Sequence, residues 1–128
     1  MTNEAIIRNY QFTRNVLAGQ DILIKQYKLK GNEVLLIQEL CMKLNSFKSY
    51  IEFKRGDLTS SIRRKTFYKI LEKLENENII TFDSKPKNQV NTYKLHFTVE
   101  FIKTVCEEEF AKEYTRWLKQ VTKKTIPY

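Results

Sequence analysis

The chain has few of the residues that build metal sites, disulfide frameworks and phosphate loops. It contains two cysteines, Cys41 and Cys106, one histidine, His96, and three glycines among 128 residues. A zinc site needs about four close ligands, and a phosphate loop needs several glycines at fixed spacing. We therefore expect no metal and no cofactor. Both cysteines are expected to be reduced and to pack as small buried hydrophobic residues.

Long apolar runs are also missing. No stretch of the sequence approaches the roughly 18 apolar residues that a membrane-spanning helix needs. The first residues, MTNEAIIRNYQF, lack the basic and then apolar pattern of a signal peptide. We expect a soluble, cytoplasmic protein without membrane insertion.

Catalytic side chains are equally sparse. The sequence has no nucleophile elbow, and His96 falls in an expected β-strand as an ordinary strand residue. Tyr68 is a candidate nucleophile for a nicking or recombining enzyme, but it lacks companion histidines or metal ligands. We expect that the chain is not an enzyme.

Positive charge exceeds negative charge along the chain. Lysine and arginine number 23 and aspartate and glutamate 15, which gives a formal net charge of +8. Such an excess favours polyanionic partners, nucleic acid or an anionic membrane surface, although it also serves as a solubilising surface. The low glycine and proline content, with 41% hydrophobic and 30% charged residues, indicates a mainly helical globular protein.

The length indicates one domain. We divide it into an N-terminal extension, residues 1–30, a core, residues 31–98, and a C-terminal helix and tail, residues 99–128. The extension is expected to begin with a helix that ends at Gly19, and residues 21–27 fit either a strand or a second short helix. Apolar residues at helical spacing support the first helix: Ile6, Ile7, Tyr10, Val16 and Leu17.

The first half of the core predicts a helix and then a short strand. A helix over residues 33–45 is expected, with Asn32 as its N-cap and Glu33 in its first turn. Its apolar stripe consists of Val34, Leu35, Ile37, Leu40, Cys41 and Leu44. Tyr50, Ile51 and Phe53 then predict a strand, followed by a turn at Gly56 and Asp57.

The second half of the core predicts two helices and a hairpin. A short helical piece is expected over residues 58–61 and a strong helix over 63–77, ending at Asn78 in the left-handed conformation. The inward positions of the strong helix are Phe67, Ile70, Leu71 and Leu74. Residues 79–82 and 91–97 predict the strands of a hairpin, and residues 83–90 form its polar tip.

The strong helix has an unusual order of charges. Its start is basic, with Arg63, Arg64, Lys65 and Lys69, whereas its second half carries three glutamates, at positions 72, 75 and 77. This order opposes the helix dipole, which favours acids at the N-terminus by roughly 0.3–1 kcal/mol each. A charge run is ordinarily a solvated face. This order instead suits a helix that presents its start to phosphates and bases.

Residues 66–80, TFYKILEKLENENII, resemble the end of the recognition helix and the first wing strand in the winged helix-turn-helix superfamily of DNA-binding proteins. The pattern there is T-φ-x-x-φ-L-x-x-L-E-x-x-G-φ-I, and Asn78 stands in place of its glycine. The resemblance covers residues 34–98 and implies a mainly α fold with a small antiparallel β-hairpin (α+β). It departs from the family in residues 58–63, which are shorter than the usual second helix and turn.

This resemblance implies that helix 63–77 enters the major groove of double-stranded DNA and that the tip 83–91 lies on the backbone or in the minor groove. The expected DNA-binding residues are Lys54, Arg55, Ser60, Ser61, Arg63, Arg64, Lys65, Thr66, Tyr68, Lys69, Lys85, Lys87, Asn88 and Gln89. In style the sequence is similar to accessory factors of plasmid or mobile-element replication, partition or conjugative transfer. A small transcriptional repressor is the alternative.

A last helix is expected over residues 99–119. Its aromatic side chains predict either a homodimer interface or a helix that covers the back of the core. The candidate dimerisation residues are Phe110, Tyr114, Trp117 and Leu118. A function of another class also fits this helix, a protein-interaction module that docks a replication or transfer partner through it. Single-stranded nucleic acid is a further candidate ligand, with Tyr68 and Tyr93 as stacking residues.

Overall fold

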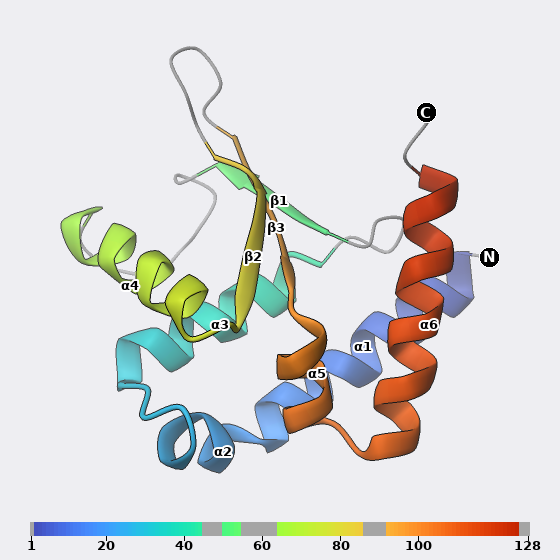
Figure 1. Cartoon of the computed structure of the whole chain (residues 1–128), viewed down its shortest axis with the longest axis horizontal. Helices are drawn as coiled ribbons and strands as arrows, with labels where there is room; N and C mark the ends of the chain where they lie inside the picture. The colour runs from blue at the N-terminus through green and yellow to red at the C-terminus, as the bar shows by residue number, and fades with distance from the viewer. Residues whose placement is uncertain (1, 45–49, 55–63, 86–91, 126–128) are drawn as a thin grey trace.

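The computed structural model describes residues 2–44, 50–54, 64–85 and 92–125, and its fold is mainly helical with one small antiparallel sheet (Figure 1). The elements in chain order are α1 (Thr2–Ala18), α2 (Gln20–Lys25), α3 (Gly31–Met42), β1 (Ile51–Lys54), α4 (Arg64–Asn76), β2 (Ile80–Ser84), β3 (Thr92–Phe97), α5 (Val99–Val105) and α6 (Glu108–Thr125). The expected α+β class is therefore confirmed. The expected turn at Gly56 and Asp57 and the short helix over 58–61 lie outside the described residues.

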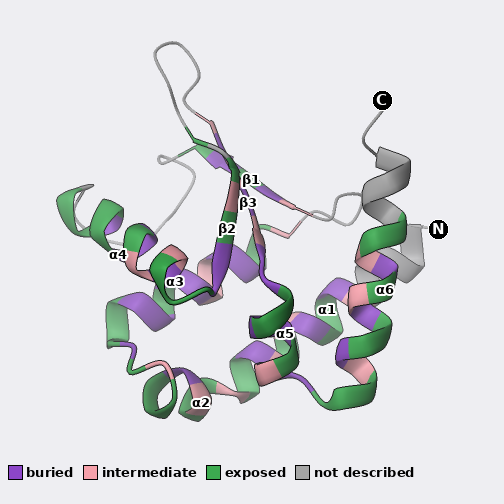
Figure 2. Ribbon diagram, in the orientation of Figure 1, coloured by how far each residue is buried: buried purple, intermediate pink, exposed green. Residues whose placement is uncertain are grey.

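The three strands form a sheet in the order β1-β3-β2, with every pair antiparallel. β1 is paired along β3 from Ile51 opposite Leu95 to Lys54 opposite Thr92. Side chains alternate between the two faces of a strand, and the buried ones share one face, so the sheet covers the core on one side only (Figure 2). The predicted hairpin is present, and the predicted first strand joins its second strand.

The N-terminal extension is two helices, and its segment over residues 21–27 is helical up to Lys25. The inward face of α1 matches the expected stripe only at Val16, which is buried together with Asn9 and Phe12, two residues outside that stripe. The expected apolar residues Ile7, Tyr10 and Leu17 are exposed instead.

α3 begins earlier than expected, at Gly31, with Lys30 and not Asn32 as its N-cap. The reason is Glu33, whose carboxylate accepts a hydrogen bond of 2.7 Å from the backbone N–H of Lys30. This is the reciprocal half of a capping box, and it satisfies a backbone donor at the start of the helix. Within the predicted apolar stripe Leu35 is half-exposed, and Leu36, which was not predicted, is fully buried.

The last helix is broken, which corrects the prediction of one helix over residues 99–119. Thr98 caps α5 by accepting a hydrogen bond from the N–H of Phe101, and α5 ends at Cys106 in an extended conformation. α6 then starts with Glu108 and Glu109 in its first turn, where the helix dipole stabilises negatively charged side chains. The apolar spacing continues through Cys106, so periodicity alone could not reveal the break.

α1 and α6 are joined by aromatic packing on the side of the molecule away from α4 (Figure 1). The ring of Tyr114 stacks on Phe12 with a centroid separation of 5.0 Å, and Phe12 also contacts Phe97 at the end of β3. The hydroxyl of Tyr114 donates a hydrogen bond of 2.8 Å to Oδ1 of Asn9. The N-terminal and C-terminal segments therefore share one core with the sheet.

Candidate nucleic-acid interface

α4 presents the predicted apolar face to the core and the predicted polar face to solvent. Its buried side chains are the expected Phe67, Ile70, Leu71 and Leu74. Its exposed side chains include Lys65, Thr66, Tyr68 and Lys69 of the predicted site. Neither Lys65 nor Lys69 makes an ion pair with a described residue. The start of the helix therefore offers two cations, a hydroxyl and a phenol to solvent on one element.

The last turn of α4 is tied to the first turn of α3 by an ion pair. Nζ of Lys73 lies 2.8 Å from Oε1 of Glu33, the carboxylate that also caps α3. Partial burial raises the pKa of Glu33. The hydrogen bonds from Lys73 and from the Lys30 backbone, together with the positive charges of both lysines, lower this pKa by more than burial raises it. The pKa of Glu33 therefore lies below its ordinary value, and the carboxylate is charged at neutral pH.

The end of α4 is fixed by Asn78 and Thr98. Asn78 has a φ of 60°, the left-handed conformation that was predicted for it. The N–H of Ile79 donates to the carbonyl of Leu74 at 2.9 Å, which closes the helix end. The hydroxyl of Thr98 donates to the carbonyl of Asn78, and the Thr98 N–H donates to Ile79. Thr98 thereby fastens α4, the end of β3 and the start of α5 together.

Aromatic rings set the distance between α4 and the sheet. Phe53 of β1 stacks on Tyr93 of β3 at 5.1 Å, and Phe67 of α4 meets both rings edge-on at 6.5 and 6.2 Å. Such packing between rigid rings holds the helix and the hairpin in one relative orientation. The exposed start of α4 and the hairpin therefore form a defined surface.

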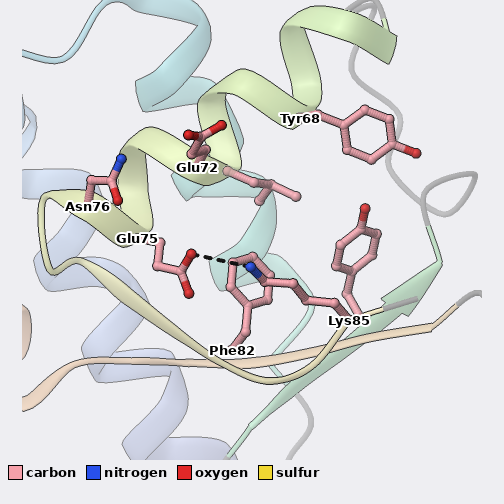
Figure 3. A pocket seen from close by; sticks show the side chains of 8 residues that line it. Tyr68, Glu72, Glu75, Asn76, Phe82 and Lys85 are labelled. Carbon is pink, nitrogen blue, oxygen red and sulfur yellow. Dashed lines mark hydrogen bonds and ion pairs between the residues drawn. The ribbon is translucent and has the colours of Figure 1, made fainter. Parts of the chain in front are cut away.

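A cleft of about 370 Å³ lies between α4 and the hairpin. It is lined by Tyr68, Glu72, Glu75 and Asn76 from α4 and by Phe82 and Lys85 from the hairpin, and Figure 3 shows Glu75 and Lys85 pointing toward each other across it. Nζ of Lys85 lies 3.3 Å from Oε1 of Glu75 and 4.6 Å from the ring centroid of Phe82. Lys85, an expected phosphate contact, is exposed but is held by a carboxylate of the helix.

The solvent-facing side of the sheet carries paired charges. His96 is 3.2 Å from Asp83, which sits at an irregularity of the β2 and β3 register between Phe82 and Ser84. Lys94 lies 3.9 Å from Glu52 on β1. His96 is therefore a paired strand residue, as expected from its position. Lys54, at the end of β1, is exposed as the site prediction requires.

Several predicted site residues fall outside the part of the chain that the structure describes. They are Arg55, Ser60, Ser61 and Arg63 before α4, and Lys87, Asn88 and Gln89 in the hairpin tip. Arg64 is the first residue of α4. The described part of the site thus consists of Lys54, Lys65, Thr66, Tyr68, Lys69 and Lys85.

The candidate dimerisation residues are mostly buried within one chain. Tyr114 is 2% exposed and Trp117 is 8% exposed, whereas Phe110 and Leu118 are partly buried. The expectation that Tyr114 and Trp117 contact a second chain is corrected, because their rings pack against Phe12 and each other. These side chains follow the alternative prediction, a helix that covers the back of the core.

Both cysteines are buried and free, as expected. Burial raises the pKa of Cys106 to about 12 and that of Cys41 further still, so neither thiol is ionised at neutral pH. The described residues contain no cluster of three or more His, Cys, Asp or Glu side chains placed to hold a metal ion. Within the same residues, no helix has the length and apolar character to cross a membrane.

Comparisons with protein families, with curated proteins and with solved structures gave no match.

Proposed function

We propose that the chain is a winged-helix protein that binds double-stranded DNA through the start of α4. The order α3, β1, α4, β2, β3 supports this proposal, as does the β1-β3-β2 sheet, because these parts of a winged helix-turn-helix occur in the same order. The short helix expected over residues 58–61 lies outside the described residues. α4 acts as the recognition helix and the β2–β3 hairpin as the wing. No catalytic step is part of this function.

The observation that carries the proposal is the distribution of charge on the exposed side of α4. Lys65 and Lys69 are exposed at its start, whereas Glu72 is exposed in its second half and Glu77 directly after its end. A cation in the first turn is unfavourable for an isolated helix, but it is favourable when a phosphate lies opposite. Thr66 and Tyr68 lie in the same turns and provide hydroxyl groups for base edges or sugar-phosphate oxygens.

The acidic half of α4 limits how the DNA lies. Glu72 and Glu75 line the cleft beside the wing, where a phosphate would meet like charge. DNA therefore contacts the first two turns of α4 and Lys54. It does not enter the cleft that Glu72 and Glu75 line. Accessory factors of plasmid or mobile-element replication, partition or transfer, and small repressors, share this mode of binding. Docking of a protein partner through the aromatic residues of α6 has less support, since Tyr114 and Trp117 are buried.

The test replaces Lys65 and Lys69, the two exposed lysines in the first turns of α4, by alanine. The double variant Lys65→Ala/Lys69→Ala should bind a labelled random duplex roughly tenfold or more weakly at about 100 mM salt, because two phosphate contacts are lost. The matched control is Lys103→Ala/Lys112→Ala, which removes two exposed lysines from α5 and α6. Equal affinity of the two double variants, measured by fluorescence anisotropy, would refute the proposed site.

Sequence preference is tested separately by selection of bound duplexes from a random pool. Arg64, the first residue of α4, and Arg63, which precedes it in the sequence, are expected to read bases. A triple variant Arg63→Ala/Arg64→Ala/Lys65→Ala should lose both affinity and preference. Unchanged selection by this variant would contradict the proposed orientation of the helix.

A further inference from the structure

The cleft between α4 and the hairpin has two chemically different walls. The α4 wall carries the carboxylates of Glu72 and Glu75 and the amide of Asn76, which share one face of the helix. The opposite wall carries the ring of Phe82, whose centroid lies 6.0 Å from that of Tyr93. The volume of about 370 Å³ falls within the range of small-molecule sites. The cleft therefore has room for a small organic molecule between hydrogen-bond acceptors and aromatic rings.

The charge of the cleft is opposite to that of the whole chain. Its lining has two carboxylates and only one ammonium group, that of Lys85, whereas the chain carries a net charge of +8. Lys85 is paired with Glu75, and Glu72 makes no ion pair with a described residue. An anion in the cleft would meet like charge, and a cation would be attracted. The lining therefore selects a ligand of positive charge.

The rings and the spacing of the acceptors narrow the class of cation. An aromatic face attracts cations, and a flat guanidinium stacks on it, whereas an ammonium group is compact and strongly hydrated. A guanidinium also pairs with one carboxylate through two N–H groups and keeps further donors for a second acceptor. Glu72 and Asn76 lie four positions apart on α4, so a carboxylate and an amide oxygen are neighbours on the same wall. This lining suits a guanidinium better than an ammonium group.

We propose that this cleft binds a small molecule that carries an alkylguanidinium group. The guanidinium pairs with Glu72 beside the aromatic wall, and its alkyl stem covers the buried side chains of Leu71 and Tyr93, which also line the cleft. A small molecule fits better than a basic polypeptide, because Lys65 and Lys69 are exposed at the start of the same helix. A polypeptide with several cations would meet these lysines outside the cleft, whereas a small cation meets only the acidic lining.

Lys85 competes with such a ligand. Its Nζ lies 3.3 Å from Oε1 of Glu75, so it neutralises one of the two carboxylates, and its charge repels a second cation. The volume of the cleft is present with Lys85 in this position, so the ligand does not have to displace it. We expect a dissociation constant on the order of 0.1–1 mM, because the ligand is small and the cleft is open to water. This inference does not depend on the proposed binding of DNA.

The first experiment is a heteronuclear NMR titration of the full chain, without DNA, with n-butylguanidinium at constant ionic strength. Saturable shifts of the backbone amide signals are expected for residues 68–76 and 82–85. n-Butylurea has nearly the same shape without the charge and should leave these signals in place. n-Butylammonium carries the same charge on a compact group and should bind roughly fivefold or more weakly. Equal responses to n-butylguanidinium and n-butylurea would overturn the site, and equal affinities for the two cations would overturn the choice of guanidinium.

The second experiment repeats the titration with variants whose effects have opposite signs. Glu72→Gln should weaken binding of n-butylguanidinium roughly tenfold, because the paired carboxylate is lost. Lys85→Gln should strengthen binding roughly threefold, because it removes a like charge and frees Glu75. The matched controls, Glu113→Gln on α6 and Lys103→Gln on α5, change exposed residues away from the cleft and should bind as the native chain does. Both cleft residues are exposed, and the spread of the amide signals checks that the variants are folded. Native affinity in Glu72→Gln, or affinity no higher than native in Lys85→Gln, would overturn the proposal.

Discussion

Nζ of Lys73 lies 2.8 Å from Oε1 of Glu33, so that one ion pair joins the last turn of α4 to the first turn of α3. The same carboxylate accepts the backbone N–H of Lys30 and caps α3. A single side chain therefore both starts one helix and positions the other. The contact therefore holds the last turn of α4, the helix that carries the exposed lysines, against α3.

Replacement of Glu33 should reveal this double role. Glu33→Gln should lower the free energy of unfolding by about 1–2 kcal/mol at pH 7, since both the cap and the ion pair are weakened. The folded pKa of Glu33 lies below its ordinary value of 4.5, so the stabilisation is present above that value and is lost as pH falls through the folded pKa. Urea denaturation of the native chain and of Glu33→Gln at several pH values measures the difference between their free energies of unfolding.

The matched control for Glu33→Gln is Glu113→Gln on α6, which is exposed. It should change the free energy of unfolding by less than about 0.5 kcal/mol at every pH. A Glu33→Gln variant as stable as this control at pH 7 would contradict the role assigned to the carboxylate.

The left-handed conformation of Asn78 predicts a difference between substitutions at one position. Asn78→Gly should be tolerated within about 0.5 kcal/mol, because glycine adopts a φ of 60° without strain. Asn78→Val should cost roughly 1–2 kcal/mol, because a β-branched side chain clashes with the backbone at positive φ. Thermal unfolding of the two variants tests this order, and equal melting temperatures would argue against the conformation.

The buried hydroxyl of Tyr114 supports the packing of α1 on α6. Tyr114→Phe removes its hydrogen bond to Asn9 and leaves the buried amide oxygen with one partner fewer. The expected loss is about 1–3 kcal/mol in the free energy of unfolding, measured by urea denaturation. The control is Tyr10→Phe, where the hydroxyl lies on an exposed side chain and its loss should cost little. Equal effects of the two changes would contradict the buried contact.

Glu75 should restrain Lys85 and weaken DNA binding. Glu75→Gln frees the ammonium group of Lys85 and removes a negative charge beside the wing, so affinity for duplex DNA should rise roughly threefold to tenfold at low salt. Glu113→Gln changes the net charge by the same amount at a position on α6, away from the cleft. Anisotropy titrations of both variants separate the release of Lys85 from the change in net charge. Equal DNA affinities of the two variants would contradict the restraint of Lys85 by Glu75.

The sequence predicted α4 and the hairpin well because their signals are local. Phe67, Ile70, Leu71 and Leu74 recur at helical spacing, and Asn78 follows at the position of a helix end. All five behave as expected, since the periodicity of a single strongly amphipathic helix leaves little choice of inward face. The exposed basic start of α4 could be read from the same pattern.

Other features depend on contacts between distant parts of the chain. Lys73 and Glu33 are 40 residues apart, and Tyr114 and Asn9 are 105 apart, so neither pair leaves a local signal. Of the apolar residues that predicted the first helix, Val16 reaches the core, whereas Ile7, Tyr10 and Leu17 are exposed and Phe12, outside that set, is buried. An apolar stripe shows that a helix packs, but it does not show against which surface.

The central claim, that the start of α4 neutralises DNA phosphates, is tested most directly by the salt dependence of duplex binding. Each phosphate contact contributes about −0.9 to the slope of log affinity against log salt concentration. Lys54, Lys65 and Lys69 together predict a slope of about −3 or steeper for the native chain on random duplex DNA. Lys65→Ala/Lys69→Ala should reduce its magnitude by about 2. A flat response of the native chain, or an unchanged slope in the double variant, would contradict the account.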